Sequence, residues 1–205
     1  MRWLIILMMA CSSLSHAQQT AKEYYEDGSI SAEGSVSDSL RNGIWKHYFL
    51  GGKLNATGNY VNGKTQGEWT YFDLKGNLEA IEYWNNGYQD GESKHFYPNG
   101  QVSKIGLFEK GQYAGEWNFY HPNGKLKRQG SYVNGLPEGW WKFWTEEGIL
   151  EQESLNHGGI EDGPARFYNS KEGWLEYEGN YSLGKQIGEW KTYNKKGKVK
   201  KVEKF

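Results

Sequence analysis

Apolar and polar side chains alternate in short runs along the chain, and the pattern returns about every 24 residues. Each repeat holds two runs of roughly six to eight residues, rich in aromatic and β-branched types and separated by glycine and asparagine. Alternation with a period of two indicates β-strands, whereas an amphipathic helix needs a 3.6-residue apolar stripe that no repeat offers. Asn-Gly pairs such as 62–63 and 86–87 supply the positive φ angles that tight hairpin turns require. The pattern therefore predicts consecutive β-hairpins.

Two series of glycines keep the phase of the repeat. The first series marks eight repeats and consists of Gly28, Gly52, Gly76, Gly100, Gly124, Gly148, Gly173 and Gly197. The second series consists of Gly43, Gly67, Gly91, Gly115, Gly139, Gly163 and Gly188. One extra residue between Gly163 and Gly173 accounts for the irregular steps in both series. Residues 18–205 are thus predicted to form one repeat domain of eight hairpins.

Tryptophan and glycine recur at complementary places in the repeat. Two residues after the second-series glycine, the chain has Trp45, Trp69, Trp117, Trp141 and Trp190, with Ser93 and Ala165 as exceptions. A further glycine, as at Gly58 and Gly130, lies six residues after the first-series glycine. A glycine within a strand leaves a dent that a ring on a neighbouring strand can cover. The first run also has an aromatic residue five after its glycine, so either a bulge redirects one ring or both sheet faces carry rings.

The run from Gly115 to Gly135, with its Gly-x-Trp-x-x-Tyr, Asn-Gly-x-Leu and Gly-x-Tyr-x-x-Gly elements, resembles the MORN-repeat variant family. This resemblance covers essentially all of residues 18–205. It implies an all-β fold, an elongated, single-layer, twisted antiparallel sheet of about eight consecutive 24-residue β-hairpin repeats. Proteins described as antitoxin components of bacterial toxin–antitoxin modules look similar. The family motif consists of fold-making residues and lacks a shared catalytic set.

Residues 1–17 are typical of a secretory signal peptide. Arg2 precedes an apolar run that begins at Trp3 and is too short for a permanent membrane helix, and Ser15-His16-Ala17 offers a cleavage site. We expect cleavage after Ala17 and export to the periplasm, the outer membrane or the medium of a bacterium. In the alternative, Met8-Met9-Ala10-Cys11 is a lipobox and Cys11 is acylated, which would anchor the protein to a membrane. Cys11 is the single cysteine, so cleavage after Ala17 leaves no thiol.

Composition and charge narrow the function further. The chain has 28 glycines, 15 tyrosines and 10 tryptophans, so its burial must come mainly from aromatic rings rather than aliphatic side chains. Its formal net charge of -1 gives no global signal for binding nucleic acid. Lysines near the end, among them Lys198 and Lys200, are expected to discourage pairing of the last strand with other chains, which favours a monomer.

A search for catalytic, cofactor and metal motifs leads us to expect none of the three. Residues 58–65 match the phosphate-loop expression letter for letter, but a further strand follows where that loop needs a helix. His47 and His95 are two repeats apart, about 19 Å in a stacked sheet, which is too far for one zinc ion. Glutamates recur at one position of the repeat and are better explained as structural than as catalytic; they are Glu68, Glu92, Glu116 and Glu189. We therefore expect a protein that is not an enzyme.

Binding is the remaining class of function. The fifth repeat carries extra rings and the sixth departs from the pattern, and repeat proteins often bind where the repeat is broken. The predicted binding surface consists of Trp140, Trp141, Trp144, Asn156 and His157. Our main hypothesis is a scaffold that binds a protein partner or an envelope component by contact alone. The alternatives are an antitoxin or immunity protein that neutralises a partner toxin, and a cell-surface glycan-binding module.

Overall fold

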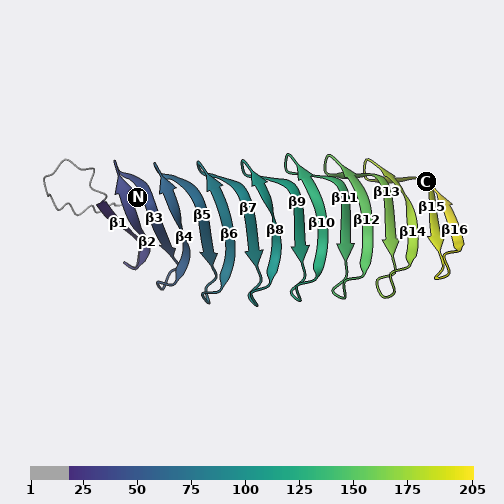
Figure 1. The fold of residues 1–205 in the computed structure, drawn as a ribbon, viewed down its shortest axis with the longest axis horizontal. Helices are drawn as coiled ribbons and strands as arrows, with labels where there is room; N and C mark the ends of the chain where they lie inside the picture. Colours follow the sequence, from purple (N-terminus) through teal and green to yellow (C-terminus); the bar gives the residue numbers. More distant parts are fainter. Residues whose placement is uncertain (1–18) are drawn as a thin grey trace. The chain divides into compact units, whose positions relative to one another are not determined.

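The computed structural model describes residues 19–205, and the predicted signal peptide, its cleavage after Ala17 and the lipobox cysteine Cys11 lie outside them. These residues form sixteen β-strands, hydrogen-bonded in chain order in an antiparallel sheet, with no helix in the described range (Figure 1). The predicted all-β class and its series of consecutive hairpins are confirmed. None of the described segments is a helix long and apolar enough to cross a membrane.

The chain divides into two compact units, the first ending at Gly91 and the second running from Glu92 to Phe205. The strands of the first unit are β1 (Gln19–Tyr24), β2 (Ile30–Ser37), β3 (Leu40–Tyr48), β4 (Leu54–Val61), β5 (Lys64–Phe72) and β6 (Leu78–Asn85). Strand β7 (Tyr88–Phe96) contains the boundary. The second unit continues with β8 (Val102–Glu109), β9 (Gln112–Tyr120), β10 (Leu126–Val133), β11 (Leu136–Trp144), β12 (Leu150–His157), β13 (Ile160–Tyr168), β14 (Leu175–Ser182), β15 (Lys185–Tyr193) and β16 (Val199–Lys204).

The hairpin turns follow from the residues at their tips. Asn62 and Gly63 both have positive φ angles, 49° and 78°, as do Asn134 and Gly135 at 52° and 79°. Two consecutive positive φ angles define the type I′ turn, whose twist matches that of the strands it joins. The second-series glycines also have positive φ, for example 76° at Gly139, and the register shifts beside it in the pairing of β10 with β11. These glycines therefore form β-bulges.

One face of the sheet in each compact unit, called the ring face, carries the recurring tryptophans. The five are Trp45, Trp69, Trp117, Trp141 and Trp190, and all are at least 96% buried. Each covers a glycine of the preceding strand: a Cβ added at Gly130 would lie 2.2 Å from Trp141, and one at Gly58 2.2 Å from Trp69. The predicted packing of rings over glycine dents is confirmed. Van der Waals overlap at that distance explains why a strand interior tolerates glycine there despite its entropic cost.

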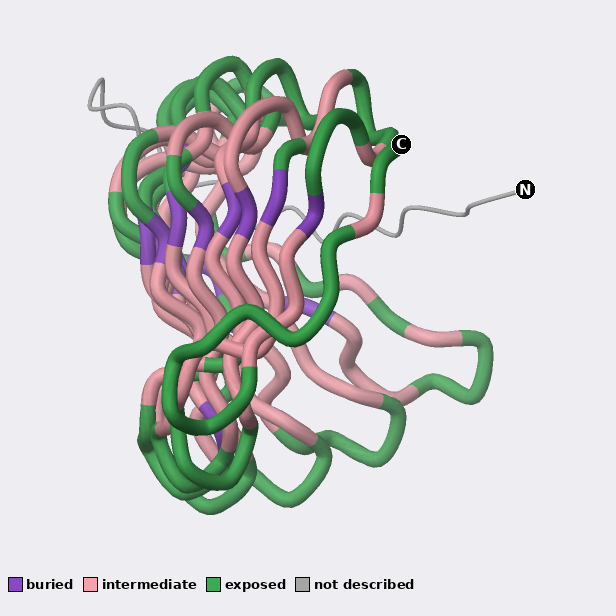
Figure 2. Tube along the Cα trace, turned by 90° about the vertical axis from the view of Figure 1, so that its right-hand side faces the viewer, coloured by how far each residue is buried: buried purple, intermediate pink, exposed green. Residues whose placement is uncertain are grey.

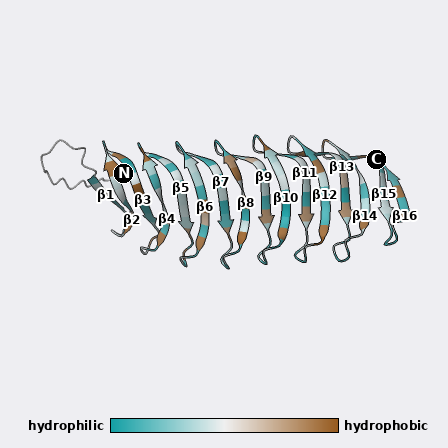
Figure 3. Cartoon of the chain, viewed as in Figure 1, coloured by the Kyte–Doolittle hydropathy of each residue, from teal (hydrophilic) through white to brown (hydrophobic). Residues whose placement is uncertain are grey.

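A second ring packs edge-on against the tryptophan in most repeats. The Tyr132 and Trp141 ring centroids lie 5.0 Å apart at an interplanar angle of 85°, and Tyr60 with Trp69 gives 5.1 Å and 89°. T-shaped pairs of this kind stabilise by about 0.5–1.5 kcal/mol beyond the burial of their area. Most buried positions lie within strands, while the turns are exposed (Figure 2). Hydrophobic and hydrophilic residues intermix along each strand, as expected for a sheet without a second layer (Figure 3).

The opposite face, called the polar face, is defined in the second unit by Lys142, Glu153, Arg166 and Glu178. Lys142 and Arg166 pair across the strands with Glu153, and Arg166 with Glu178. The Tyr168 hydroxyl, from the ring five residues after the second-series glycine, donates to Glu153 at 2.8 Å. Both faces therefore carry aromatic rings, and bulges are present as well. Both explanations given for the aromatic residue five after the second-series glycine, a bulge and rings on both faces, are correct.

Candidate binding surface

Trp140 and Trp141 are consecutive residues of β11 but lie on opposite faces of the sheet. Trp141 belongs to the ring face and is 4% exposed, whereas Trp140 is 41% exposed. The Arg166 guanidinium lies 5.9 Å from the centroid of the Trp140 ring, which places this indole on the polar face beside Arg166. Trp140 also pairs across the strands with Leu155. Trp140 can meet a partner, and Trp141 is part of the packing that holds the sheet.

Trp144 lies at the far end of β11 from the tight turns and is half-buried. Trp144 is equivalent to Tyr168 of the next repeat. The Tyr168 hydroxyl donates a hydrogen bond to Glu153 on the polar face, so we place the Trp144 ring on that face as well. The backbone carbonyl of Trp144 accepts a hydrogen bond from Nε2 of His121 at 2.9 Å. Because a carbonyl oxygen can only accept, the proton of the neutral His121 ring is on Nε2. Trp144 is therefore tied to the loop end of the preceding repeat.

Asn156 and His157 are brought together with Glu138 at the tight-turn end of the sheet. Nδ1 of His157 lies 2.8 Å from Oε1 of Glu138, and the backbone N–H of Gly158 donates to Oε2 of the same carboxylate at 2.9 Å. These two hydrogen bonds, that of Gly158 first, hold the pKa of Glu138 below its ordinary value. The His157 side chain remains 77% exposed. Asn156 pairs with Gly139 on the adjacent strand.

A shallow depression of about 490 Å³ surrounds this group. Side chains and backbone from β11 to β15 line it, including Glu138, Asn156, His157, Asp162 and Ile187. A second depression of about 360 Å³ adjoins it and shares Asn180, and its other lining residues include Arg166, Glu178 and Lys191. The structure thus places Asn156 and His157 in one hollow, with Trp140 near it on the polar face, while Trp141 and Trp144 are elsewhere.

A ladder of ion pairs crosses the polar face beside the two depressions. Arg166 Nη1 lies 3.0 Å from Glu153 and Arg166 Nε 3.6 Å from Glu178, and Lys142 lies 4.0 Å from Glu153. Burial alone would raise the pKa of Glu153, but hydrogen bonds from Arg166 and Tyr168 outweigh it and lower that pKa. Burial, followed by the hydrogen bond to Glu153, raises the pKa of Tyr168 to about 12. These groups satisfy one another and rigidify the floor of the surface.

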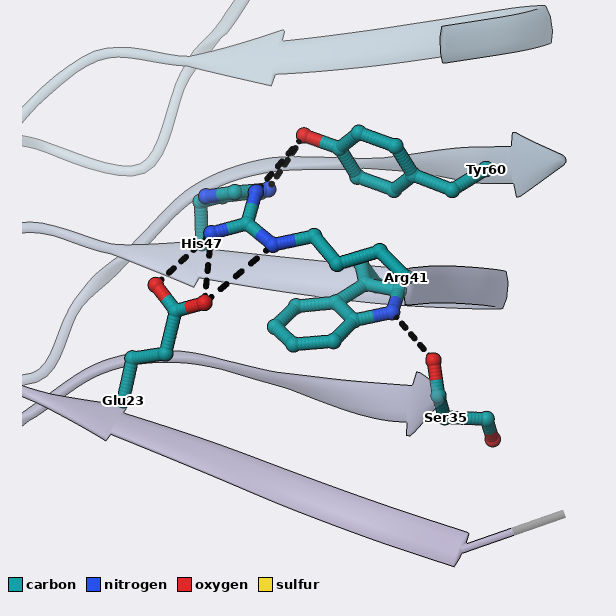
Figure 4. Close-up of polar contacts among 6 residues, drawn as sticks. Glu23, Ser35, Arg41, His47 and Tyr60 are labelled. Carbon is teal, nitrogen blue, oxygen red and sulfur yellow. Dashed lines mark hydrogen bonds and ion pairs between the residues drawn. The ribbon is translucent and has the colours of Figure 1, made fainter. Parts of the chain in front are cut away.

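The first compact unit contains a cluster of titratable groups around Arg41 (Figure 4). The Arg41 guanidinium binds both carboxylate oxygens of Glu23, at 2.8 and 2.7 Å, and donates to the Tyr60 hydroxyl at 2.9 Å. It also stacks on Trp45, 4.4 Å from the ring centroid. Burial, and next the Arg41 charge, lower the pKa of His47, which lies 3.4 Å from the Tyr60 hydroxyl. Every group in the cluster has a partner, so we assign it to packing.

In the described part of the chain, few side chains are arranged for chemistry other than contact with a partner. Residues 19–205 contain no group of three or more His, Cys, Asp or Glu side chains placed to hold a metal ion. The phosphate-loop match from Gly58 to Thr65 lies in the hairpin of β4 and β5, where Tyr60 pairs directly with Thr65. The structure therefore places that segment in a strand–turn–strand unit.

Several residues of the depressions did not emerge from the sequence. Asp162 lies three residues before the position of the recurring tryptophan. Residues at equivalent positions of the repeats form a column, and the column of Asp162 also holds Asn42, Gln66, Asp90, Ala114, Glu138 and Ile187. Leu155 packs over the second-series glycine of the next strand, since a Cβ at Gly163 would lie 2.8 Å from it. Comparing columns of the repeat would have singled out Trp140, because its equivalents are Ile44, Glu68, Glu92, Glu116, Pro164 and Glu189. Asn180 carries no sequence signal of this kind.

Comparison with known proteins supports the repeat. The model of the family described as "MORN repeat variant" matches residues 41–62, 89–110 and 114–134, so the resemblance is confirmed for these three segments. No curated protein matches the chain. None of these findings names an antitoxin.

Solved structures give only distant likenesses. The crystal structure of TarM is 12% identical over 60% of this chain and 19% of that chain, with a TM-score of 0.27. The GtfA/B complex bound to UDP and GlcNAc is 11% identical over 72% of this chain and 28% of that one, with a TM-score of 0.25. A porin-like protein from Bacteroides uniformis is 11% identical over 85% of this chain and 89% of that one, with a TM-score of 0.23. This chain spans less than a third of the first two, and at such scores none of these likenesses bears on function.

Proposed function

We propose that this protein is an exported, non-enzymatic binding or scaffold protein, which engages a protein partner or an envelope component through the polar face of its second unit. One observation carries the proposal: Trp140 exposes 41% of its surface at a position where the repeat requires no ring. Rings that the repeat requires, such as Trp141, pack over a glycine of the preceding strand. A large indole kept in solvent costs hydrophobic free energy that a bound partner would recover.

The scaffold part of the proposal rests on the rigidity of the surface around Trp140. The ion pairs of Arg166 with Glu153 and Glu178 hold its floor on β12 to β14, and the T-shaped pair of Tyr132 with Trp141 fixes the opposite face of β10 and β11. A surface organised before binding loses little conformational entropy on association, so such a face can bind by contact alone.

The test is affinity capture with the full chain, tagged and expressed in its own source, followed by mass spectrometry of the envelope and secreted fractions. We expect a saturable component that is retained by the wild-type chain and lost with Trp140→Ala. The matched control is Ile44→Ala, which removes the 60% exposed side chain at the equivalent position of another repeat. Capture that is indifferent to Trp140→Ala would refute the surface. A captured protein that is toxic when expressed alone would make the function immunity.

Fractionation of the same cells tests export. We expect the chain in the envelope or the medium, with an N-terminus at residue 18 if cleavage follows Ala17 and a lipid-modified Cys11 if the lipobox is used. An intact N-terminus in the cytoplasm would overturn the exported part of the proposal and leave the binding surface standing.

A further inference from the structure

The two depressions on the polar face form one hollowed surface. They lie on neighbouring strands, share Asn180, and together run from the tight-turn end of β11 and β12 towards the middle of β15. The larger volume, about 490 Å³, is within the range of small-molecule sites, about 300–1,000 Å³. Both are open to solvent, so a ligand here would lie along the sheet instead of entering a closed cavity.

Three polar side chains in the hollow have no hydrogen bond or ion pair to any other described residue. They are the carboxylate of Asp162, the amide of Asn180 and the hydroxyl of Ser182, and all three line the larger depression. Asp162 and Ser182 are half-buried. By contrast, the neighbouring Glu138 is fully engaged by His157 and Gly158. The free groups therefore provide acceptors at Asp162, a donor and an acceptor at Asn180, and a hydroxyl that can do either.

An apolar platform adjoins these polar groups. The Trp140 ring is exposed and pairs with Leu155, which itself lines the larger depression, and Ile187 lines it with 44% of its surface exposed. The Arg166 guanidinium lies over the indole, 5.9 Å from the ring centroid, and 41% of the Trp140 surface remains exposed. An exposed aromatic ring of this kind suits a partly apolar ligand.

The chemistry of the lining discriminates between classes of ligand. Anions are disfavoured, because Asp162 and Glu138 place two carboxylates in the hollow. Purely apolar ligands are disfavoured, because they would leave Asp162 and Asn180 unsatisfied, and a buried unpaired polar group costs about 1–3 kcal/mol. A sugar ring offers hydroxyls that both donate and accept around its rim, together with an apolar face of C–H groups. That combination matches the free groups and the platform.

We propose that this hollow is a saccharide-binding site for a neutral oligosaccharide that lies across the strands, with one sugar ring on Trp140 beside the hollow and hydroxyl groups along the same chain hydrogen-bonded to Asp162 and Asn180. The second depression, continuous through Asn180, would receive a further sugar of the same chain. The inference rests on the proposed function, since it names the chemistry of the envelope component that the polar face binds.

The test is titration calorimetry of the full chain with a panel of neutral tetrasaccharides built from glucose, galactose, mannose or N-acetylglucosamine. We expect at least one to bind and to quench tryptophan emission. Asp162→Asn should weaken binding about tenfold or more, the loss expected for a hydrogen bond to a charged group. Trp140→Ala should weaken it by a similar factor, because it removes the apolar surface under the sugar ring. The matched controls are Ile44→Ala and Asp90→Asn, at the equivalent positions of other repeats, and both should bind as the wild type does. Circular dichroism of each variant separates loss of binding from loss of fold.

Two results would overturn the inference. No heat and no change in emission across the whole panel, while affinity capture yields a protein whose retention depends on Trp140, would mean that the hollow binds a polypeptide and that the proposed function stands without the sugar. Saccharide binding that survives both Trp140→Ala and Asp162→Asn would place the sugar elsewhere. If capture and titration are both empty, the proposed function fails with the inference.

Discussion

The fifth repeat (residues 124–147) and the sixth (residues 148–172) have different side chains at the equivalent positions of the ring face. In the fifth, Gly130 lies beneath Trp141 and Tyr132 packs on that ring edge-on at 5.0 Å. In the sixth, the equivalent positions hold Ser154, Ala165 and Asn156, with Ser154 directly paired to Ala165. Large and small residues have thus changed together across two strands, and both Trp141 and Ala165 are buried. The paired positions have changed in opposite directions, glycine to serine and tryptophan to alanine, while the set of three side chains has become smaller overall.

The polar face of the two repeats differs in parallel. Gln129 in the fifth repeat has the place of Glu153 in the sixth, and Trp144 has the place of Tyr168. Where a glutamate is present, the ring beside it is a tyrosine whose hydroxyl donates to it, as Tyr48 donates to Glu33 at 2.6 Å in the first repeat. Columns of the repeat vary as coupled pairs, because each side chain meets its partner on the adjacent strand.

The largest effect should come from breaking the ring stack of the fifth repeat. Trp141→Ala removes a ring that is 4% exposed, so we expect it to lower the free energy of unfolding by about 4 kcal/mol, as measured by urea denaturation followed by circular dichroism. The adjacent Trp140→Ala, on the exposed face, should cost less than about 1 kcal/mol. Equal losses for the two variants would show that the ring face is not the stabilising one.

Filling the glycine dent should be the next largest effect. Gly130→Ala puts a Cβ 2.2 Å from the Trp141 ring, and the resulting overpacking should cost about 3 kcal/mol by the same measurement. Ser154→Ala, its control in the sixth repeat, faces Ala165 and should change stability by less than about 1 kcal/mol. A tolerated Gly130→Ala would mean that the indole can slide aside.

The coupling itself can be rebuilt in the sixth repeat. Ala165→Trp alone meets the Cβ of Ser154 and should lower stability by about 2 kcal/mol, whereas adding Ser154→Gly should restore most of that loss. Urea denaturation of both single variants and the double variant measures the interaction energy. Additive effects would contradict the exchange of size between the two strands.

The smallest effect concerns the polar face and depends on pH. Glu153 has a folded-state pKa below its ordinary value, so its contribution is present above the unfolded pKa of about 4.3 and is lost as the pH falls through the folded value. Glu153→Gln, which copies Gln129 of the fifth repeat, should lower the free energy of unfolding by about 1 kcal/mol at pH 7. Below pH 5, the free energy of unfolding of this variant should fall with decreasing pH by about 1 kcal/mol less than that of the wild type. Urea denaturation at several pH values measures both. A variant with the acid sensitivity of the wild type would show that Arg166 and Tyr168 do not stabilise the carboxylate.

Much of the fold could be read from the residues because its determinants are local. Asn62-Gly63 encodes a turn through two positive φ angles, and the spacing between Gly130 and Trp141 encodes a ring over bare backbone across a single hairpin. The binding surface could be read only in part. Trp140, Trp141 and Trp144 form one cluster in sequence, but the structure divides them between two faces and two ends of β11.

By itself, the sequence determined the hairpins, their phase and the partners of most rings, because strand alternation and turn geometry act over fewer than about ten residues. Only the tertiary structure decided which side chains surround Trp140, since the pairing of neighbouring strands brings Leu155 and Arg166 beside it. It also decided which polar groups share a hollow. Glu138, Asp162 and Ile187 come from three different repeats, and they lie around one depression because antiparallel pairing sets their strands side by side in a fixed register.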